Sequence, residues 1–477
     1  MKIDLNEKKA YLFEIPKKDK MQVPAFIYAS KEMIDSIRND ECIRQLIHMT
    51  QLPGIVQNAL AMPDIHSGYG FPIGGVAAFD EENGIISPGG VGYDINCGVR
   101  LIRTLIEKKD IKNNMEQLVN TLFQQIPSGA GAKKKKLRTD LKGVISKGSQ
   151  WAVKKGYGEE RDITFTEENG CMKDADINNI SKRALDRGKH QLCTLGGGNH
   201  FLEIDVVDEI FDSNIARTFG LFEQQVAVLL HTGSRGLGYQ ICDDYLKKIQ
   251  KKYSKGKISS PNSQLAGVPI NSSIGLAYYS AMSGAANYAW ANRQIITHFV
   301  REIFQTVLTM SPKDLGMDLV YDLSHNIAKK EQHIVKGDKQ TLYVHRKGAT
   351  RAFGPGHHSL PLDYINTGQP VIVPGDMGNA SYVLCGSKTA MEKTFGSACH
   401  GAGRVLSRSA AKKAAKGRLL LEELEDKGIV VRYRGRATLA EEMPDAYKNI
   451  SDVVEIIVQA GIAKKVARLK PLGVIKG

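Results

Sequence analysis

The most constraining feature of this sequence is a recurring pattern, in which a short apolar run leads into a glycine-rich loop that carries a histidine or a carboxylate. VAVLL (226–230) leads into HTGSRGLG, DLVYDL (318–323) into SHN, TLYVH (341–345) into RKGATRAFGPG, and PVIV (370–373) into PGDMGNASY. Such runs are typical of buried strands, and loops at strand ends are where rigid scaffolds present chemistry. The pattern therefore predicts buried strands that deliver reactive side chains to a common site.

Helical periodicity alternates with these runs, most clearly over 111–125, 275–308 and 404–425. The alternation has no regular strand–helix–strand rhythm, so we predict an α+β fold. The motif residues are scattered from position 64 to position 476, which predicts one large domain over residues 1–477 that closes around one site. The polar, basic stretch 128–148 lies between two periodic segments and is predicted to be a flexible surface loop within that domain.

The charge balance indicates an anionic partner. The formal net charge is +14, with basic runs at 133–136, 247–257, 412–416 and 464–470. A lysine run taken singly is usually a solvated surface, but several runs together with a global excess favour a nucleic acid. RNA or DNA is therefore a natural partner.

Cysteine usage and the first residues bear on location. The seven cysteines are an odd number without framework spacing, which is typical of reduced thiols in a long chain. The segment MKIDLNEKKAYLFEI has no apolar core of a secretory signal, and no later stretch is long and apolar enough for a membrane span. We expect a cytoplasmic protein without a membrane partner.

Asp94 and Cys97 are the first candidate metal ligands. They lie three residues apart beside glycines in SPGGVGYDINCGVR, so that a carboxylate and a thiolate can face one cation. Taken alone, Cys97 is more often a small buried apolar residue.

Three histidines extend this set. His200 lies in LGGGNHFLEID, His231 in LLHTGSRG and His325 in DLSHNIA, each at the end of an apolar run or beside Gly, Ser or Asn. Any one of them is more often a core or surface histidine, but imidazole is the commonest metal ligand and ligands from separate strand ends converge. Together the five donors exceed the needs of one tetrahedral ion, whereas two ions that share the thiolate would fit, as in phosphoryl chemistry. Zinc suits thiolate and imidazole, and the carboxylate leaves room for manganese.

A second cluster, SACHGAGR, places His400 and Arg404 around a Gly-Ala-Gly turn. A turn of this kind that opens a helix is an anion site, and Arg404 could add a forked phosphate contact; the alternative is a plain helix cap. His400 could act there as base, ligand or nucleophile. As a nucleophile it needs a partner for its other ring nitrogen. Asp64 in MPDIHSGYGFPIGG is the first candidate and His66 the second, against ordinary turn chemistry as the alternative.

Seven motifs, taken in their order along the chain, resemble the RtcB family of GTP-dependent RNA ligases, and the resemblance extends from about residue 20 onward. The motifs are GYDINCGVR, GGGNHFLEI, HTGSRG, SHNIA, HRKGATRAFGPG, PGDMG and CHGAGR. The resemblance implies a single-domain α+β fold and the joining of RNA 3′-phosphate or 2′,3′-cyclic phosphate ends to 5′-hydroxyl ends, in tRNA splicing or RNA repair. It implies GTP and two Mn²⁺ ions as cofactors. The implied partners are tRNA halves or cleaved RNA, and an activating protein of the archease type that some members use.

The resemblance also assigns roles. Asp94, Cys97 and His200 would hold one manganese, and Cys97, His231 and His325 the other. His400 would be the nucleophile that attacks the α-phosphorus of GTP, with Asp64 as its partner. The implied guanylate contacts are Asn199, His200, Phe201, Leu202, Glu203, His325, Asn326, Pro374, Gly375, Asp376, Met377, Ser381, His400, Gly401, Ala402, Gly403, Tyr447 and Lys476. Asp376 occupies a position where the family also has a small polar residue.

Two other functions compete with this one. A binuclear metallohydrolase such as a phosphodiesterase would use the same five ligands with His400 as general acid, but it leaves GGGNHFLEI and Lys476 without a role. A basic RNA-binding or chaperone module with a structural zinc predicts binding without turnover, but a closed tetrahedral site needs fewer ligands. Dependence on GTP separates the ligase from the hydrolase.

Overall fold

Two sheets organise the chain, and a computed structural model describes residues 3–134, 140–253 and 263–477. The first sheet has the strand order β1 (Asn6–Lys9), β2 (Leu12–Ile15), β3 (Ala25–Tyr28), β4 (Ile55–His66), β5 (Ile73–Asp80), β13 (Asp338–Lys347) and β12 (Asn326–Val335). The second has the order β11 (Asp318–Ser324), β7 (Gly98–Glu107), β9 (Gln225–Thr232), β8 (Phe201–Ile210), β19 (Ala463–Lys476), β16 (Ser381–Gly386) and β15 (Pro370–Val373).

One shorter strand joins the second sheet, and four others form two separate pairs. β18 (Val430–Tyr433) lies parallel to β19, while β6 (Ile85–Ile86) pairs with β10 (Val268–Pro269), and β14 (Ala349–Arg351) pairs with β17 (Ser397–Cys399). Neighbouring strands of the two long sheets are antiparallel except at β3–β4 and β18–β19. The strands predicted over 226–230, 318–323, 341–345 and 370–373 are confirmed as β9, β11, β13 and β15.

Helices surround the sheets, and the mixture confirms the predicted α+β class. They are α1 (Lys31–Ile37), α2 (Glu41–Met49), α3 (Pro88–Val91), α4 (Lys108–Ile111), α5 (Met115–Gln125), α6 (Leu141–Lys154), α7 (Glu160–Thr164), α8 (Lys182–Gly188), α9 (Ser213–Phe219), α10 (Arg235–Tyr253), α11 (Ser273–Leu308), α12 (Pro312–Leu315), α13 (Lys388–Lys393), α14 (Arg408–Ala414), α15 (Leu420–Glu425), α16 (Arg436–Glu441) and α17 (Ile450–Gln459). Among the described residues, no helix is long and apolar enough to cross a membrane.

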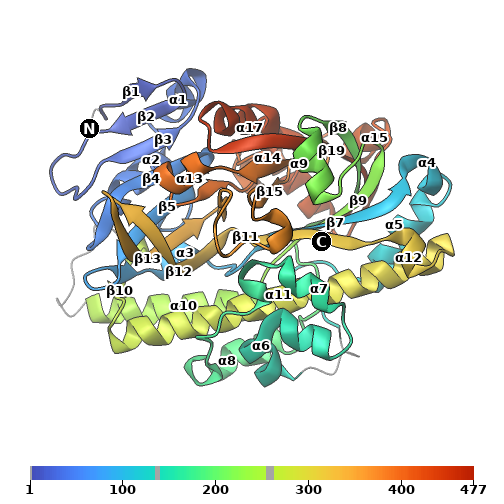
Figure 1. The fold of residues 1–477 in the computed structure, drawn as a ribbon, viewed down its shortest axis with the longest axis horizontal. Coiled ribbons are helices and arrows are strands. Elements are labelled where there is room, and N and C mark those ends of the chain that lie inside the picture. Colours follow the sequence, from blue (N-terminus) through green and yellow to red (C-terminus); the bar gives the residue numbers. More distant parts are fainter. Residues whose placement is uncertain (1–2, 135–139, 254–262) are drawn as a thin grey trace.

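The longest helix, α11, supports the second sheet. It spans 36 residues, and its middle is buried on all sides, from Tyr278 to Thr297. It crosses the lower half of Figure 1, above α6 and α8, and packs against α10 and α6. A helix buried all round must satisfy its polar side chains internally. Arg293 of α11 does so by donating hydrogen bonds to residues of the second sheet.

Three sequence predictions need correction. Only part of 128–148 is irregular, because α6 begins at Leu141, where the Asp140 side chain accepts a hydrogen bond from the Gly143 backbone N–H; residues 135–139 lie outside the described part. The helix predicted over 404–425 is instead two short helices, α14 and α15. Its first residues form a loop in place of a helical turn, and Gly417, with φ of 83°, separates α14 from α15. The helix over 111–125 starts later, at Met115, whereas that over 275–308 is confirmed as α11.

A buried ionic cluster joins α11 to the second sheet. The Asp322 carboxylate accepts hydrogen bonds from Arg100 Nε at 2.7 Å and from Arg293 Nε and Nη2 at 2.8 Å each, and the three side chains are fully buried. Removal of one partner from such a pair leaves an uncompensated buried charge.

We therefore expect Asp322→Asn to lower the free energy of unfolding by about 3–5 kcal/mol, measured by chemical denaturation. Asp318→Asn is the matched control on the same strand, because Asp318 is 34% exposed and pairs with Arg103 at the surface. Its expected change is below about 1 kcal/mol. Equal losses in the two variants would contradict the role of the buried cluster.

Candidate metal centre and catalytic histidine

Four adjacent strands deliver the predicted metal ligands to one end of the second sheet. Cys97 directly precedes β7, His200 directly precedes β8, His231 lies near the end of β9, and His325 follows β11. The register aligns these ends, since Val99 and Phe201 both pair with His231, and Gly98 pairs with Ser324. Strand pairing thus places four residues that are distant in sequence side by side.

The donor atoms converge on Cys97. Its Sγ lies 3.3 Å from His200 Nε2 and 3.2 Å from His231 Nε2. His231 Nε2 lies 3.2 Å from His325 Nε2, and His200 Nε2 lies 2.7 Å from an Asp94 carboxylate oxygen. The three imidazoles therefore present the same ring nitrogen to one space.

The five residues form two ligand groups that share the thiol. Asp94, Cys97 and His200 are one group, and Cys97, His231 and His325 are the other; within each, the donor atoms lie within 4.8 Å of one another. Carboxylate, thiolate and imidazole all bind divalent transition metals. The residues could therefore hold two divalent ions, one at each group, with Cys97 belonging to both groups.

The protonation states agree with this use. Burial lowers the pKa values of His231 and His325 well below the usual range, so both imidazoles are neutral, the form that binds metals. Burial and the Asp94 carboxylate raise the pKa of Cys97. The thiol therefore needs a cation beside it in order to ionise.

Arg293 holds the loops that carry three of these ligands. Its Nη1 donates to the carbonyls of Asn96 at 2.9 Å and Thr232 at 2.8 Å, which adjoin Cys97 and His231. Its fork on Asp322 fixes β11, which leads to His325. Asn96 adopts a positive φ of 52°, a conformation that Asn tolerates better than most residues. The strand ends are thus positioned by protein groups alone.

His400 stands at the edge of this centre, beside Asp64. One Asp64 carboxylate oxygen accepts from His400 Nδ1 at 2.6 Å and from the His400 backbone N–H at 2.9 Å. The ring centroids of His400 and His325 are 4.8 Å apart. With Nδ1 held by Asp64, Nε2 is the nitrogen of His400 that is left to react. The structure thus brings together the first candidate pair, while His66 Nδ1 contacts the Asp64 carbonyl instead.

A cavity of about 910 Å³ opens in front of His400. Its lining includes thirteen of the predicted guanylate contacts, namely Asn199, Phe201, His325, Asn326, Pro374, Gly375, Asp376, His400, Gly401, Ala402, Gly403, Tyr447 and Lys476. His200, Leu202, Glu203, Met377 and Ser381 lie outside this lining. Ser381 still shapes it, because its hydroxyl accepts from the Gly375 backbone N–H at 3.1 Å.

The proposed helix-terminus cradle does not form as the sequence suggested. Helix α14 begins at Arg408 with Ser407 as its N-cap, so the loop Gly401–Gly403 does not open it. Arg404 is not free to make the predicted forked contact with a phosphate. Its guanidinium donates instead to Glu442, the Tyr447 hydroxyl, and the Glu441 and Leu406 carbonyls. Arg404 therefore stabilises the wall of the cavity in front of His400. The buried carboxylate of Glu442, which also accepts from the Tyr447 hydroxyl, has no motif around it and was missed.

A second cavity of about 550 Å³ lies on the other side of the ligand loops. Tyr93, Asp94, Arg187, Arg235 and Tyr239 contribute to its lining. Tyr239 is 45% exposed; its ring stacks on Tyr93 with centroids 4.8 Å apart, and the Arg187 guanidinium lies 5.0 Å from its centroid. Asp94 thus faces this cavity, while His231 and His325 face the first. Of these two aromatic residues, Tyr93 lies in the motif GYDINCGVR, whereas Tyr239 belongs to no recognised motif.

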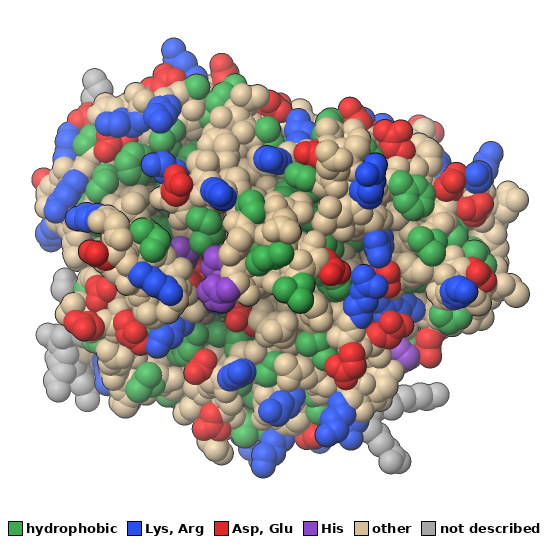
Figure 2. Space-filling view, in the orientation of Figure 1, with side chains coloured by type: hydrophobic (Ala, Val, Ile, Leu, Met, Phe, Trp, Pro, Cys, Tyr) green, Lys and Arg blue, Asp and Glu red, His purple; other side chains and the backbone are tan. Residues whose placement is uncertain are grey.

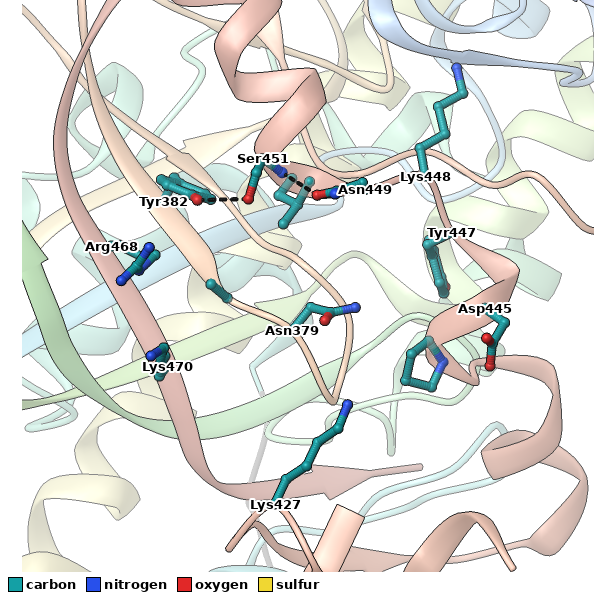
Figure 3. Close-up of a pocket in the computed structure, with 13 residues that line it drawn as sticks. Asn379, Tyr382, Lys427, Asp445, Tyr447, Lys448, Asn449, Ser451, Arg468 and Lys470 are labelled. Atoms are coloured by element: carbon teal, nitrogen blue, oxygen red, sulfur yellow. Dashed lines mark hydrogen bonds between the residues drawn. The ribbon is translucent and has the colours of Figure 1, made fainter. Parts of the chain in front are cut away.

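A third cavity, of about 600 Å³, borders the first at Tyr447 (Figure 3). Its cations are largely engaged: Arg468 contacts Asp208 and Glu209, Lys470 contacts Asp208, and the Lys448 ammonium points away from the cavity. The basic run 464–470 is therefore mostly paired. On the face seen in Figure 2, basic and acidic side chains are interspersed, so the positive excess does not gather in one patch there.

Comparison with known proteins identifies the family. The model of the family described as "tRNA-splicing ligase RtcB" matches residues 45–477. The chain belongs to this family.

Curated relatives agree over the full length. A protein of Methanococcus maripaludis named tRNA-splicing ligase RtcB is 52% identical over 471 residues, which cover 98% of each chain. Proteins of the same name from Archaeoglobus fulgidus and Thermococcus kodakarensis are 52% and 51% identical, over 98% of this chain. The predicted resemblance is confirmed, and the chain is an enzyme of the ligase class.

The shared thiol leads to a prediction about metal stoichiometry. We expect the wild type to bind two divalent ions per chain, His231→Ala to retain one and Cys97→Ala to retain neither with high affinity, because Cys97 alone belongs to both groups. Equilibrium dialysis against Co²⁺, followed by elemental analysis of the protein, counts the ions bound by each variant. Cys171→Ala, which alters a thiol outside both groups, should bind as the wild type does. Full occupancy in Cys97→Ala would contradict the bridging arrangement.

Proposed function

We propose that this chain is a GTP- and Mn²⁺-dependent RNA ligase that joins RNA 3′-phosphate or 2′,3′-cyclic phosphate ends to 5′-hydroxyl ends. Its relatives are named tRNA-splicing ligases, so we propose tRNA halves as its RNA, with cleaved RNAs under repair as further substrates. The observation that carries the proposal is the Asp64–His400 pair, which turns one histidine nitrogen toward a large cavity beside a two-metal ligand set.

In the proposed first step, His400 Nε2 attacks the α-phosphorus of GTP. A phosphorus–nitrogen bond forms and the bond to the pyrophosphate leaving group breaks. Asp64 accepts the hydrogen bond from Nδ1 throughout, which fixes the tautomer and stabilises the positive charge that develops on the ring. Mn²⁺ ions on the two ligand groups would neutralise phosphate charge and align the α-phosphorus.

In the later steps the RNA 3′-phosphate takes the guanylate from His400, and a cyclic phosphate is first hydrolysed to a 3′-phosphate. The resulting anhydride makes GMP a good leaving group, and the 5′-hydroxyl displaces it as the new phosphodiester forms. The cavity in front of His400 is large enough for a nucleotide and a strand end together.

We further propose that the 5′-hydroxyl strand enters through the second cavity. It reaches Asp94 from the side opposite His400, and it offers an exposed aromatic ring with two arginines, Arg187 and Arg235. Aromatic and guanidinium planes stack on unpaired bases, and arginine pairs with phosphate. The two ends would thus meet at the ligand loops from opposite sides.

The nucleophile is tested with GTP labelled at the α-phosphate, in the presence of Mn²⁺. We expect the wild type to retain acid-labile label and His400→Ala to retain none, because the label resides on its imidazole. His298→Ala is the control, since His298 lies on α11 and outside the lining of the cavity in front of His400. Label that persists in His400→Ala would exclude this histidine, and RNA cleavage without GTP would favour the hydrolase.

The second cavity is tested at Tyr239. We expect Tyr239→Ala to reduce joining of 5′-hydroxyl RNA by about ten- to hundredfold at subsaturating RNA, since loss of one stacked base costs about 1–3 kcal/mol. Labelling of His400 by GTP should not change. Tyr239→Phe keeps the ring and should join RNA at nearly the wild-type rate. Unchanged joining by Tyr239→Ala would place the strand elsewhere.

A further inference from the structure

The position of Asp64 depends on tight backbone packing. Asp64 is fully buried on β4, and the loop Gly401–Gly403 crosses directly over it. A Cβ at Gly403, where φ is 74°, would lie 2.3 Å from the Asp64 carbonyl oxygen, and one at Gly74 would lie 2.9 Å from its carboxylate. Small shifts of the backbone around Asp64 would therefore move the carboxylate that orients His400.

Lys448 fastens this backbone on both sides of Asp64. Its Nζ donates to the carbonyl oxygens of Pro63 at 2.8 Å and Ile65 at 2.7 Å, the residues that flank Asp64. Its backbone N–H donates to the Gly403 carbonyl at 2.9 Å. Lys448 therefore links the two segments that carry Asp64 and His400.

This use of a lysine is unusual, because the partly buried ammonium donates to main-chain carbonyls and has no carboxylate as its hydrogen-bond partner. Figure 3 shows its side chain directed away from the third cavity and toward the N-terminal part of the chain, whereas Arg468 and Lys470 lie along β19 at the opposite wall. Burial lowers the pKa of Lys448 to about 8, and the nearby Asp64, Cys42 and Asp40 oppose that change. A buried cation in this place offsets the negative charge of the buried Asp64.

Lys448 also follows Tyr447, whose ring lines the cavity in front of His400. Tyr447 is held by Glu442 and Arg404, so this turn is fixed from both sides. The same turn thus contributes one residue to the nucleotide cavity and the next to the support of Asp64.

We propose that Lys448 is a positioning residue for the guanylylation of His400, acting by holding the Asp64 backbone and balancing its charge; this inference rests on the proposed function. The Lys448 side chain donates to Pro63 and Ile65, which are neither metal ligands nor part of the lining in front of His400. Its loss should therefore slow the chemical step without weakening nucleotide binding.

The test compares Lys448→Met, Lys448→Arg and Lys470→Met in the full chain. Lys470→Met is the matched control, since Lys470 lines the same third cavity but pairs at the surface with Asp208. Affinity is measured with the α,β-methylene analogue of GTP, which cannot transfer guanylate. The rate is measured as single-turnover labelling of His400 by α-labelled GTP, and unfolding midpoints show whether each variant is folded.

We expect Lys448→Met to bind the analogue within about twofold of wild type and to label about ten- to hundredfold more slowly, as for a misaligned nucleophile. Lys448→Arg, which keeps the charge, should regain part of the rate, and it carries the test if Lys448→Met does not fold. Lys470→Met should match the wild type.

The inference is overturned if folded Lys448→Met labels at the wild-type rate, if its defect lies wholly in analogue affinity, or if Lys470→Met is equally slow. If the wild type is labelled, the proposed function stands even when one of these outcomes overturns the inference about Lys448. A wild type that takes no label overturns both.

Discussion

The candidate site depends on one buried contact, the bidentate ion pair between Arg293 and Asp322. Arg293 reaches from α11 to the backbone beside Cys97 and His231, and Asp322 lies on the strand that leads to His325. A pair of this kind adds little net stability, because its desolvation penalty is large, but it allows few alternative arrangements. The contribution of this ion pair to the site is to position residues. It sets three strand ends in place, so that binding energy from an ion is not spent on ordering loops.

The sequence predicted this site well where a residue's chemistry is visible in its own type and neighbours. His231 and His325 could be recognised because each ends or follows an apolar run beside small residues, and Cys97 because it lies three residues from Asp94 beside glycines. Strand pairing then brings the three together. Asp64 required a further step, since its carboxylate meets His400 across 336 residues. Asp64 was nevertheless chosen, because an imidazole nucleophile needs a hydrogen-bond partner for its other ring nitrogen.

Residues that act through the backbone escaped prediction. Lys448 and Arg293 serve by donating to main-chain carbonyls, which no local pattern records. The helix expected over 404–425 failed for the opposite reason. Its alanines and lysines favour helix, but Arg404 is drawn into tertiary contacts with Glu442 and Tyr447, and tertiary contacts override weak local preference.

The placement of β19 has a consequence for how the chain acquires its fold during synthesis. β19 lies between β8 and β16 in the second sheet, and its Arg468 meets Asp208 of β8 across 260 residues. Until β19 has emerged from the ribosome, β8 keeps an unpaired apolar edge, a template for wrong pairing between nascent chains. Lys476, at the end of β19, closes the cavity only then. The edge of β8 therefore stays open from its own synthesis until that of β19, and the cavity in front of His400 is complete only when the sheet is.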